Sequence, residues 1–289
     1  YTYYTCVQCE DCVRRALQAL RLGVFWGEGD YMIIVLDVGN TNTKIGIFDG
    51  DTAVRSLRLS SSVNQTSDEY GFYLVNMLKD SGIHAEDITG GIISSVNPNL
   101  NYTFEHMLEY YFHIKPYIVG AGIKTGINIK YDNPKEVGSD RIVGCVAAYN
   151  LYGGPCVVID CGTATTFNVV SEKGDFLGGA IAAGLKSSAS ALFNGTAKLP
   201  KVEFVAPKTI INKTTITNMQ GGLVYGYVSM VEGIIGRIRR EFGKPLRVIA
   251  TGGLSEIVAA ESNVIDVVDR SLTLKGLNVI YRLQQNKTV

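Results

Sequence analysis

The stretch VLDVGNTNTKIGIF, residues 35–48, and the stretch IDCGTATTFNVV, residues 159–170, share one layout. In each of them an apolar strand ends in an aspartate, a turn that contains glycine follows, and a second strand begins at once. The two leading acids are Asp37 and Asp160. Because each copy opens its own run of predicted strands and helices, the repeat predicts two α/β domains, 32–150 and 151–289, that pack across a cleft.

The first turn carries groups that suit phosphate oxygens. Gly39 lets the backbone reverse sharply, and Asn40, Thr41 and Thr43 provide short polar side chains beside exposed N–H donors. Asp37 stands at the end of the strand, where a carboxylate can hold a hydrated Mg²⁺ that bridges phosphates. The first hairpin is therefore a candidate site for a nucleoside triphosphate and its metal ion.

The second turn repeats this chemistry, and its polar and turn residues are Asp160, Gly162, Thr163, Thr165 and Thr166. A single copy of this short pattern is a common reversal with no ligand, because aspartate and glycine favour turns. Two copies, each after an apolar strand, favour two loops that hold one triphosphate from both sides. The stretch ATGG, residues 250–253, adds a turn at which glycine permits close approach of a flat nucleotide.

The hydrophobic pattern predicts the remaining elements. Helices are expected over 67–79, after Pro98, from about Arg141, over 219–242 and from about Ser271. A short buried strand is expected over 90–96, and further strands are expected over 115–120 and 247–251. No Walker-type G-x-x-x-x-G-K-[ST] occurs, so the sequence argues against a P-loop enzyme.

Composition narrows the choice of partners. Hydrophobic residues make up 46% of the 289, which is enough for a substantial core. The 27 basic side chains balance the 27 acidic ones, so we expect no nucleic acid and no anionic membrane among the partners. No apolar run has the length needed to span a bilayer.

Residues 1–31 differ in character from the rest, and we interpret them as an appendage outside a functional fold that begins at Met32. Cys6, Cys9 and Cys12 form C-x2-C-x2-C there, but no fourth ligand follows nearby, which favours incidental cysteines over a metal site. The later cysteines lie in apolar surroundings and are expected to be small core residues: Cys145, Cys156 and Cys161.

The double hairpin followed by a TGG turn resembles the actin-like ATPase superfamily of sugar kinases, Hsp70 chaperones and actin. Within it, an ordered set of stretches closely resembles type III pantothenate kinases, also described as the Bvg accessory factor family. The set consists of LDVGNTNTKIGIF, YDNPKEVGSDRIVG, DCGTATTFNVV, GGAIAAGL and TTITNMQGG. The resemblance runs from Met32 to the C-terminus. It implies two ribonuclease H-like domains with mixed sheets flanked by helices, and ATP-dependent phosphorylation of pantothenate on its primary hydroxyl, the first step of coenzyme A synthesis.

The resemblance also implies roles for individual residues. Asp140 would be the catalytic base, and Arg141 would face the pantothenate carboxylate or a phosphate, although a salt bridge that orients Asp140 is a nearly equal alternative. Asp160 would hold a monovalent cation, K⁺ or NH₄⁺. The residues implied to line the substrate pocket are Tyr131, Gly138, Ser139, Asp140, Arg141 and Thr215. The residues implied to contact ATP are Asp37, Val38, Gly39, Asn40, Thr41, Asn42, Thr43, Lys44 and Thr163.

Members of this family are cytoplasmic homodimers, so the resemblance makes the helix over 219–242 a candidate dimer contact. The sequence departs from the family pattern at Ala183, where proline is usual, at Ser139, where alanine is common, and at Asn168. Two alternatives stay open. One is another small-molecule kinase of the superfamily acting on a sugar or acetate, and the other is a non-catalytic regulator on the same scaffold.

Overall fold

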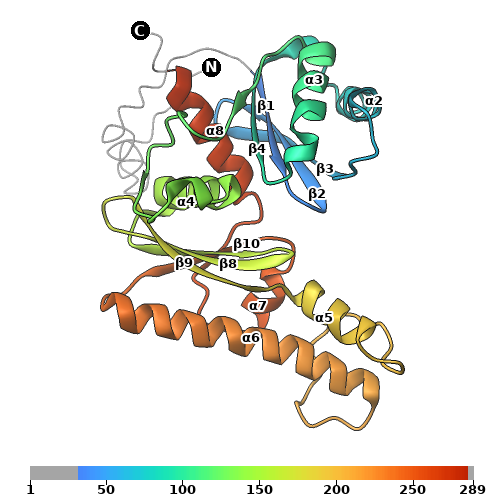
Figure 1. The fold of residues 1–289 in the computed structure, drawn as a ribbon, viewed down its shortest axis with the longest axis vertical. Coiled ribbons are helices and arrows are strands. Elements are labelled where there is room, and N and C mark those ends of the chain that lie inside the picture. The colour runs from blue at the N-terminus through green and yellow to red at the C-terminus, as the bar shows by residue number, and fades with distance from the viewer. Residues whose placement is uncertain (1–31, 286–289) are drawn as a thin grey trace, which may run out of the picture. The chain divides into compact units, whose positions relative to one another are not determined.

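The computed structural model describes residues 32–285, and the predicted appendage with its three cysteines lies outside the described residues. The described chain divides into two compact units. The first unit consists of the chain up to Ile127, of Lys135–Tyr152 and of the chain from Thr273, and the second consists of Asn128–Pro134 and Gly153–Leu272. Each unit contains one mixed sheet flanked by helices, which confirms the predicted α/β class (Figure 1).

The sheet of the first unit has the strand order β3-β2-β1-β4-β5. Its strands are β1 (Met32–Val38), β2 (Asn42–Asp49), β3 (Thr52–Ser60), β4 (Ile88–Ser95) and β5 (Tyr117–Ile118). The first three pair antiparallel through tight turns, and β4 and β5 join in parallel. Both faces of β1 are buried, which explains why its sequence is apolar without alternation.

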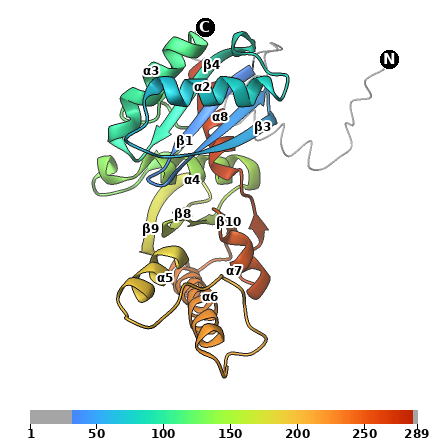
Figure 2. The same ribbon diagram turned by 90° about the vertical axis from the view of Figure 1, so that its right-hand side faces the viewer.

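Helices cover both faces of this sheet. α2 (Ser67–Lys79) forms as predicted, because Thr66 caps it and exchanges hydrogen bonds with Glu69 in a capping box. α3 (Asn101–Phe112) follows the short 3₁₀ turn that Pro98 opens, and with α2 it packs on the face that includes Ile34 and Leu36. α8 (Leu272–Gln285) lies on the opposite face, as Figure 2 shows.

Glycines lie at three points where α8 packs against its neighbours, and one of them belongs to α8 itself. A Cβ on Gly90 of β4 would lie 1.9 Å from the Tyr281 hydroxyl, and one on Gly46 of β2 would lie 3.3 Å from Leu274. A Cβ on Gly276 would lie 2.2 Å from the backbone oxygen of Val143 in α4 (Ser139–Tyr152). These contacts assign α8 to the first unit, whereas the sequence prediction drew the second domain as continuous to residue 289.

The sheet of the second unit repeats the antiparallel hairpin with parallel neighbours, in the order β11-β10-β7-β8-β9-β6. Its strands are β6 (Asn128–Ile129), β7 (Cys156–Cys161), β8 (Ala164–Val170), β9 (Asp175–Ala183), β10 (Arg247–Thr251) and β11 (Val267–Val268). The helices of this unit are α5 (Leu185–Asn194), α6 (Thr215–Phe242) and α7 (Ser255–Glu261). The long helix predicted over 219–242 therefore begins one turn earlier, at a cap that Thr214 provides.

One face of the second sheet forms a core with α6. Ile159 and Cys161 of β7, Phe167 of β8 and Ala250 of β10 share this core with Val231 of α6. Cys145, Cys156 and Cys161 are buried thiols, which confirms their prediction as core residues. Among the described residues, no helix has both the length and the apolar character that crossing a membrane requires.

Gly276→Ala tests the close packing of α8 on α4. Alanine favours helix by up to about 1 kcal/mol over glycine. At Gly276, however, the added methyl meets backbone, which no rotamer change relieves. We expect the free energy of unfolding to fall by about 1–3 kcal/mol in urea titrations, as for other overpacked cores. Gly233→Ala in α6, where nothing lies within 4 Å of the added Cβ, is the matched control and should not destabilise. Equal effects at both positions would contradict this packing.

Candidate active site

In the first unit, the β1–β2 hairpin ends in a compact turn. The Gly39 N–H donates to the Asn42 carbonyl oxygen at 3.1 Å, and a Cβ on Gly39 would lie 2.9 Å from that oxygen, so the turn requires glycine. Asn40, Thr41 and Asn42 are exposed at its tip, where their side chains and amides can reach a ligand. The predicted loop geometry is therefore present in the first hairpin.

Not every predicted side chain of this hairpin reaches its surface. Val38 is buried in the strand, and Thr43 is fully buried with its hydroxyl 2.9 Å from that of Ser61. Their side chains therefore support the hairpin, and any contact with a ligand would have to come from their backbone. Strand alternation causes this, because successive side chains point to opposite faces.

Asp37 lies at the end of β1 and is only 8% exposed. It pairs across the hairpin with Lys44, whose Nζ lies 3.4 Å from the Asp37 Oδ2. On its other side, Asp37 pairs with Ser94 of β4. A carboxylate and an ammonium group thus stand together beside the turn, where the lysine can also serve a phosphate as a point charge.

The N-terminus of α4 is fixed to the end of β4 by a chain of hydroxyl groups. Ser94 Oγ donates to Ser139 Oγ at 2.9 Å, and Ser139 Oγ donates to the Ser95 carbonyl oxygen at 3.0 Å. Since Ser94 is the register partner of Asp37, these bonds hold the start of α4 beside the aspartate-ended strand. Ser94 was missed from the sequence, although it is a polar residue near the end of a buried strand, as Asp37 is.

Asp140 follows in the first turn of α4, where the helix dipole favours an acid. Its Oδ1 accepts a hydrogen bond from the Arg141 N–H at 2.8 Å, and a Cβ on Gly138 would lie 2.5 Å from the same oxygen. Gly138 therefore leaves room for the Asp140 carboxylate in its observed orientation. The structure brings together four of the predicted substrate residues, Gly138, Ser139, Asp140 and Arg141, and adds Asp37.

Burial raises the pKa of Asp140, and the negative charge of Asp37 raises it further. The N–H of Arg141 and then its guanidinium charge act in the opposite direction, but they do not cancel the rise. Arg141 is itself buried, at 8% exposed. A partly buried carboxylate with a raised pKa is a stronger base than an ordinary aspartate, which suits a group that accepts a proton from an alcohol.

In the second unit, the β7–β8 turn is also closed by glycine. The Gly162 N–H donates to the Ala164 carbonyl oxygen at 3.1 Å. Thr163 is exposed, and its carbonyl oxygen accepts hydrogen bonds from the Gly184 N–H at 3.1 Å and from Ser187 Oγ at 2.7 Å. The side chain of Thr163 is thus presented by a turn that β9 and α5 hold in place.

The hydroxyl cluster predicted for this turn is divided between the two faces of the sheet. Thr165 is fully buried, and its Oγ1 lies 2.6 Å from the Tyr227 hydroxyl of α6. Its expected role as a phosphate ligand is wrong for this reason. Burial raises the pKa of Tyr227 well above its ordinary value, so the phenol stays neutral. Tyr227 was not found from the sequence, since it is one of several apolar-face residues of a long helix.

Asp160 is the next-to-last residue of β7, and its carboxylate lies against the ATGG turn. Gly252 has a φ of +93°, and a Cβ there would lie 2.5 Å from Asp160 Oδ1 and 2.7 Å from the Cys161 carbonyl oxygen. The space that glycine leaves is therefore bordered by two oxygen acceptors. Oxygen ligands of this kind fit a hard cation.

Mg²⁺ is commonly held by one or two carboxylates, waters and substrate phosphates, and not by a cage of protein ligands. Among residues 32–285, no group of three or more His, Cys, Asp or Glu side chains is placed to hold a metal ion. Asp37 as a single carboxylate beside the first turn fits this mode of binding.

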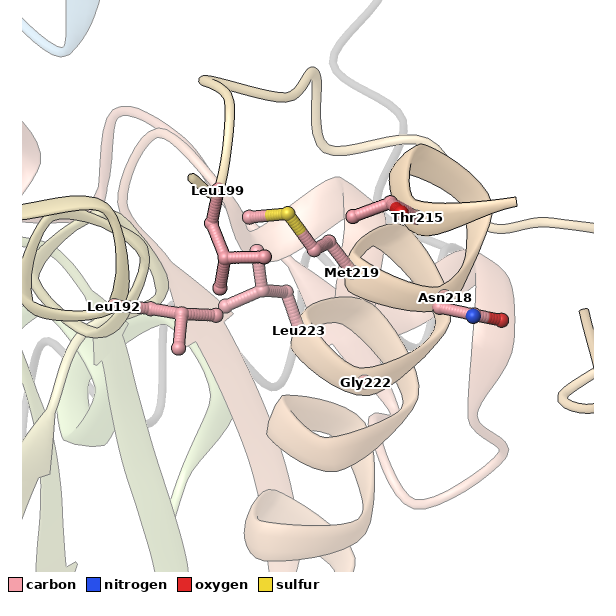
Figure 3. Close-up of a pocket in the computed structure, with 7 residues that line it drawn as sticks. All are labelled: Leu192, Leu199, Thr215, Asn218, Met219, Gly222 and Leu223. Carbon is pink, nitrogen blue, oxygen red and sulfur yellow. The ribbon is translucent and has the colours of Figure 1, made fainter. Parts of the chain in front are cut away.

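The remaining predicted substrate residues belong to the second unit. The Tyr131 ring lies 6.0 Å from that of Phe176 and 3.6 Å from the Cβ position of Gly178. Thr215 is exposed at the start of α6, where it borders a pocket of about 480 Å³ (Figure 3). The pocket is lined by Leu192, Leu199, Thr215, Asn218, Met219, Gly222 and Leu223. That Tyr131 and Thr215 contact the same substrate as Asp140 stays a prediction.

Solved structures with similar folds place the chain in a class. A conserved putative Baf family transcriptional activator from Campylobacter jejuni aligns with a TM-score of 0.56 at 18% identity, covering 88% of this chain and 100% of that one. Component A of (R)-2-hydroxyglutaryl-CoA dehydratase from Acidaminococcus fermentans aligns with a TM-score of 0.53 at 14% identity, covering 89% and 100%. Both alignments extend over most of this chain, so its fold of two mixed sheets flanked by helices is shared with these proteins.

Sequence comparison then resolves the family. The model of a family described as type III pantothenate kinase matches residues 33–237. A type III pantothenate kinase of Geobacillus sp. (strain WCH70) is 51% identical over 256 residues, which are 89% of this chain and 99% of that protein. The counterpart from Halalkalibacterium halodurans is 48% identical over 251 residues, 87% and 99%. The chain belongs to the type III pantothenate kinase family.

The raised pKa of Asp140 predicts how stability depends on pH. The folded protein holds this proton more tightly than the unfolded chain, so the stabilisation present below the unfolded pKa, about 3.9, is lost as pH rises through the folded pKa. Asp140→Asn cannot ionise. The urea midpoint of this variant should therefore exceed that of the wild type by a small amount near pH 4 and by a larger amount toward neutral pH. Asp80→Asn, exposed at the end of α2, is the control. A difference that shrinks with rising pH would overturn the assignment.

Proposed function

We propose that this protein transfers the γ-phosphoryl group of ATP to the primary hydroxyl of pantothenate, the first step of coenzyme A synthesis. The observation that carries the proposal is the Asp140 site, found in a chain about half identical to type III pantothenate kinases over most of its length. A carboxylate with a raised pKa, fixed beside an aspartate-ended hairpin, is what an alcohol phosphotransferase requires of its own side chains.

Asp140 accepts the proton of the pantothenate hydroxyl as that oxygen approaches phosphorus. The hydrogen bond from the Arg141 N–H fixes the orientation of the carboxylate, and the Ser94–Ser139 bond fixes the helix that carries it. The Arg141 guanidinium, whose charge acts on Asp140, faces a carboxylate or phosphate of the substrate. Positioning and charge stabilisation carry most of the catalysis in reactions of this kind.

The first hairpin holds the phosphates of ATP through the backbone of residues 37–44 and the side chain of Lys44. Asp37 holds Mg²⁺, which neutralises the charge of the phosphates when it is bound. In the second unit, Thr163 contacts ATP, and Asp160 with the Cys161 carbonyl oxygen holds K⁺ or NH₄⁺. The oxygen-bordered space at Gly252 supports this last assignment.

Three further features of the proposal come from the family resemblance. Tyr131 and Thr215 contact pantothenate, the protein is a homodimer with α6 as a candidate contact, and it acts in the cytoplasm. Exposed apolar side chains at the start of α6 and just before it, Ile210, Ile211 and Ile216, support an interface in this part of the second unit.

The test is release of ADP from ATP with pantothenate, compared with a panel of sugars and with acetate. Of these substrates, we expect only pantothenate to be turned over. In Asp140→Asn, kcat should fall by a factor of about 10²–10⁴, the range that a general base contributes. ATP binding should persist in that variant, because Asp140 lies outside the hairpin. Asp80→Asn should match the wild type.

Near-normal turnover in Asp140→Asn would remove Asp140 from the base role. Turnover with a sugar or acetate in place of pantothenate would favour another kinase of the superfamily, and ATP binding without turnover on any of these substrates would favour a regulator.

A further inference from the structure

Three polar side chains form a row across the strand ends of the second unit. Strand pairing places Asp160 of β7 opposite Thr251 of β10 and opposite Thr166 of β8. Residues paired on neighbouring strands point to the same face of a sheet. The carboxylate of Asp160 is therefore flanked by a threonine on each side.

This row faces away from α6. Ile159, Cys161 and Ala250, which alternate with the row along their strands, belong to the core that α6 shares. Because side chains alternate between faces, Asp160 and Thr251 lie on the opposite face. The row is consequently independent of the buried Thr165–Tyr227 pair.

Thr251 is 1% exposed, and its Oγ1 makes no hydrogen bond within the described part of the chain. A buried hydroxyl left without a partner costs about 1–3 kcal/mol. Valine has the same shape without that cost, so a hydroxyl at this position indicates that it has a partner outside the protein chain. In particular, it does not donate to Asp160, although the two residues are adjacent in register.

The atoms around the row are acceptors. Asp160 Oδ1 and the Cys161 carbonyl oxygen border the space left by Gly252, which directly follows Thr251 in the chain. On the other side, Thr166 Oγ1 already accepts a hydrogen bond from Asn168 Nδ2 at 3.0 Å. One group that serves a carboxylate, a carbonyl and a hydroxyl oxygen together is a cation, and the partly buried charge of Asp160 favours it.

We propose that the Thr251 hydroxyl is a ligand of the monovalent cation held at Asp160, and that it sets the affinity of the site for K⁺. This inference rests on the proposed function, since it deepens the cation assignment made there. The bound species is a monovalent cation that is coordinated by oxygen atoms. A bridging water in place of the cation is the competing explanation, and the experiment separates the two.

The central variant is Thr251→Val, which keeps the shape of the side chain and removes its oxygen. Two quantities are measured, the concentration of KCl that half-activates ADP release and the rise in Tm caused by KCl. Ionic strength is held constant with tetramethylammonium chloride. We expect the half-activating concentration to rise between about tenfold and about a hundredfold, as when groups around a bound metal are removed. The KCl-specific rise in Tm should shrink in parallel.

Stability without K⁺ distinguishes this role from a structural one. In tetramethylammonium chloride alone, Thr251→Val should be at least as stable as the wild type, because a buried orphan hydroxyl is lost. Thr251→Ser, which keeps the oxygen, should restore most of the K⁺ response. Thr273→Val removes another buried hydroxyl without a hydrogen-bond partner, in α8 of the first unit, and should leave the K⁺ response unchanged.

A half-activating concentration in Thr251→Val within about twofold of the wild type, a change of under about 0.5 kcal/mol, would overturn the inference and assign the hydroxyl to a water. If that variant does not fold, Thr251→Ala is read against Thr251→Ser in the same way. A wild type that turns over pantothenate equally well without K⁺ would overturn this inference and the Asp160 assignment, but not the proposed reaction. Absence of pantothenate turnover would instead contradict the proposed function.

Discussion

The arrangement of the first unit depends on holding two carboxylates of like charge close together in a partly buried place. Asp37 is nearly enclosed, and its charge is one of the causes that raise the pKa of Asp140. Repulsion between the two charges and burial both disfavour ionisation of the two carboxylates together, so neighbouring groups must offset this cost. Lys44 stands beside Asp37, and the N–H and guanidinium of Arg141 act on Asp140. The pKa of Asp140 is nevertheless raised, because burial and the charge of Asp37 outweigh the groups that lower it.

The two aspartate-ended hairpins share a plan but differ in what surrounds the acid. Asp37 is paired with a cation from its own hairpin, and a serine of the parallel strand β4 lies next to it. Asp160 is flanked by threonines, and the glycine after Thr251 opens a space against its carboxylate. The proposed Mg²⁺ site at Asp37 and the proposed K⁺ site at Asp160 would therefore use the same kind of hairpin with different neighbours around the carboxylate.

Much of this could be predicted because the determining signals are local. Aspartate and glycine at the strand ends, the capping box of α2 and the periodicity of α6 each specify their own segment. The membership of α8 in the first unit could not be predicted, since it depends on Gly90 and Gly276, which admit a helix distant in sequence. The burial of Thr165 was missed for a related reason. In a turn that returns directly to a strand, the first paired residues already alternate between faces.

Two departures from the family pattern have a physical explanation in these surroundings. Ser139, where alanine is common, supplies the hydroxyl that joins Ser94 to the Ser95 carbonyl oxygen, so this chain adds a bond between β4 and the helix that carries Asp140. The side-chain amide of Asn168 donates a hydrogen bond to the Thr166 hydroxyl oxygen, so the Thr166 hydroxyl directs its own proton to another group. Thr166 is the register partner of Asp160. In both cases the unusual residue acts one step away from an aspartate. It changes the hydrogen bonding of a neighbour and leaves the carboxylate itself in place, which is how a site can vary without losing its chemistry.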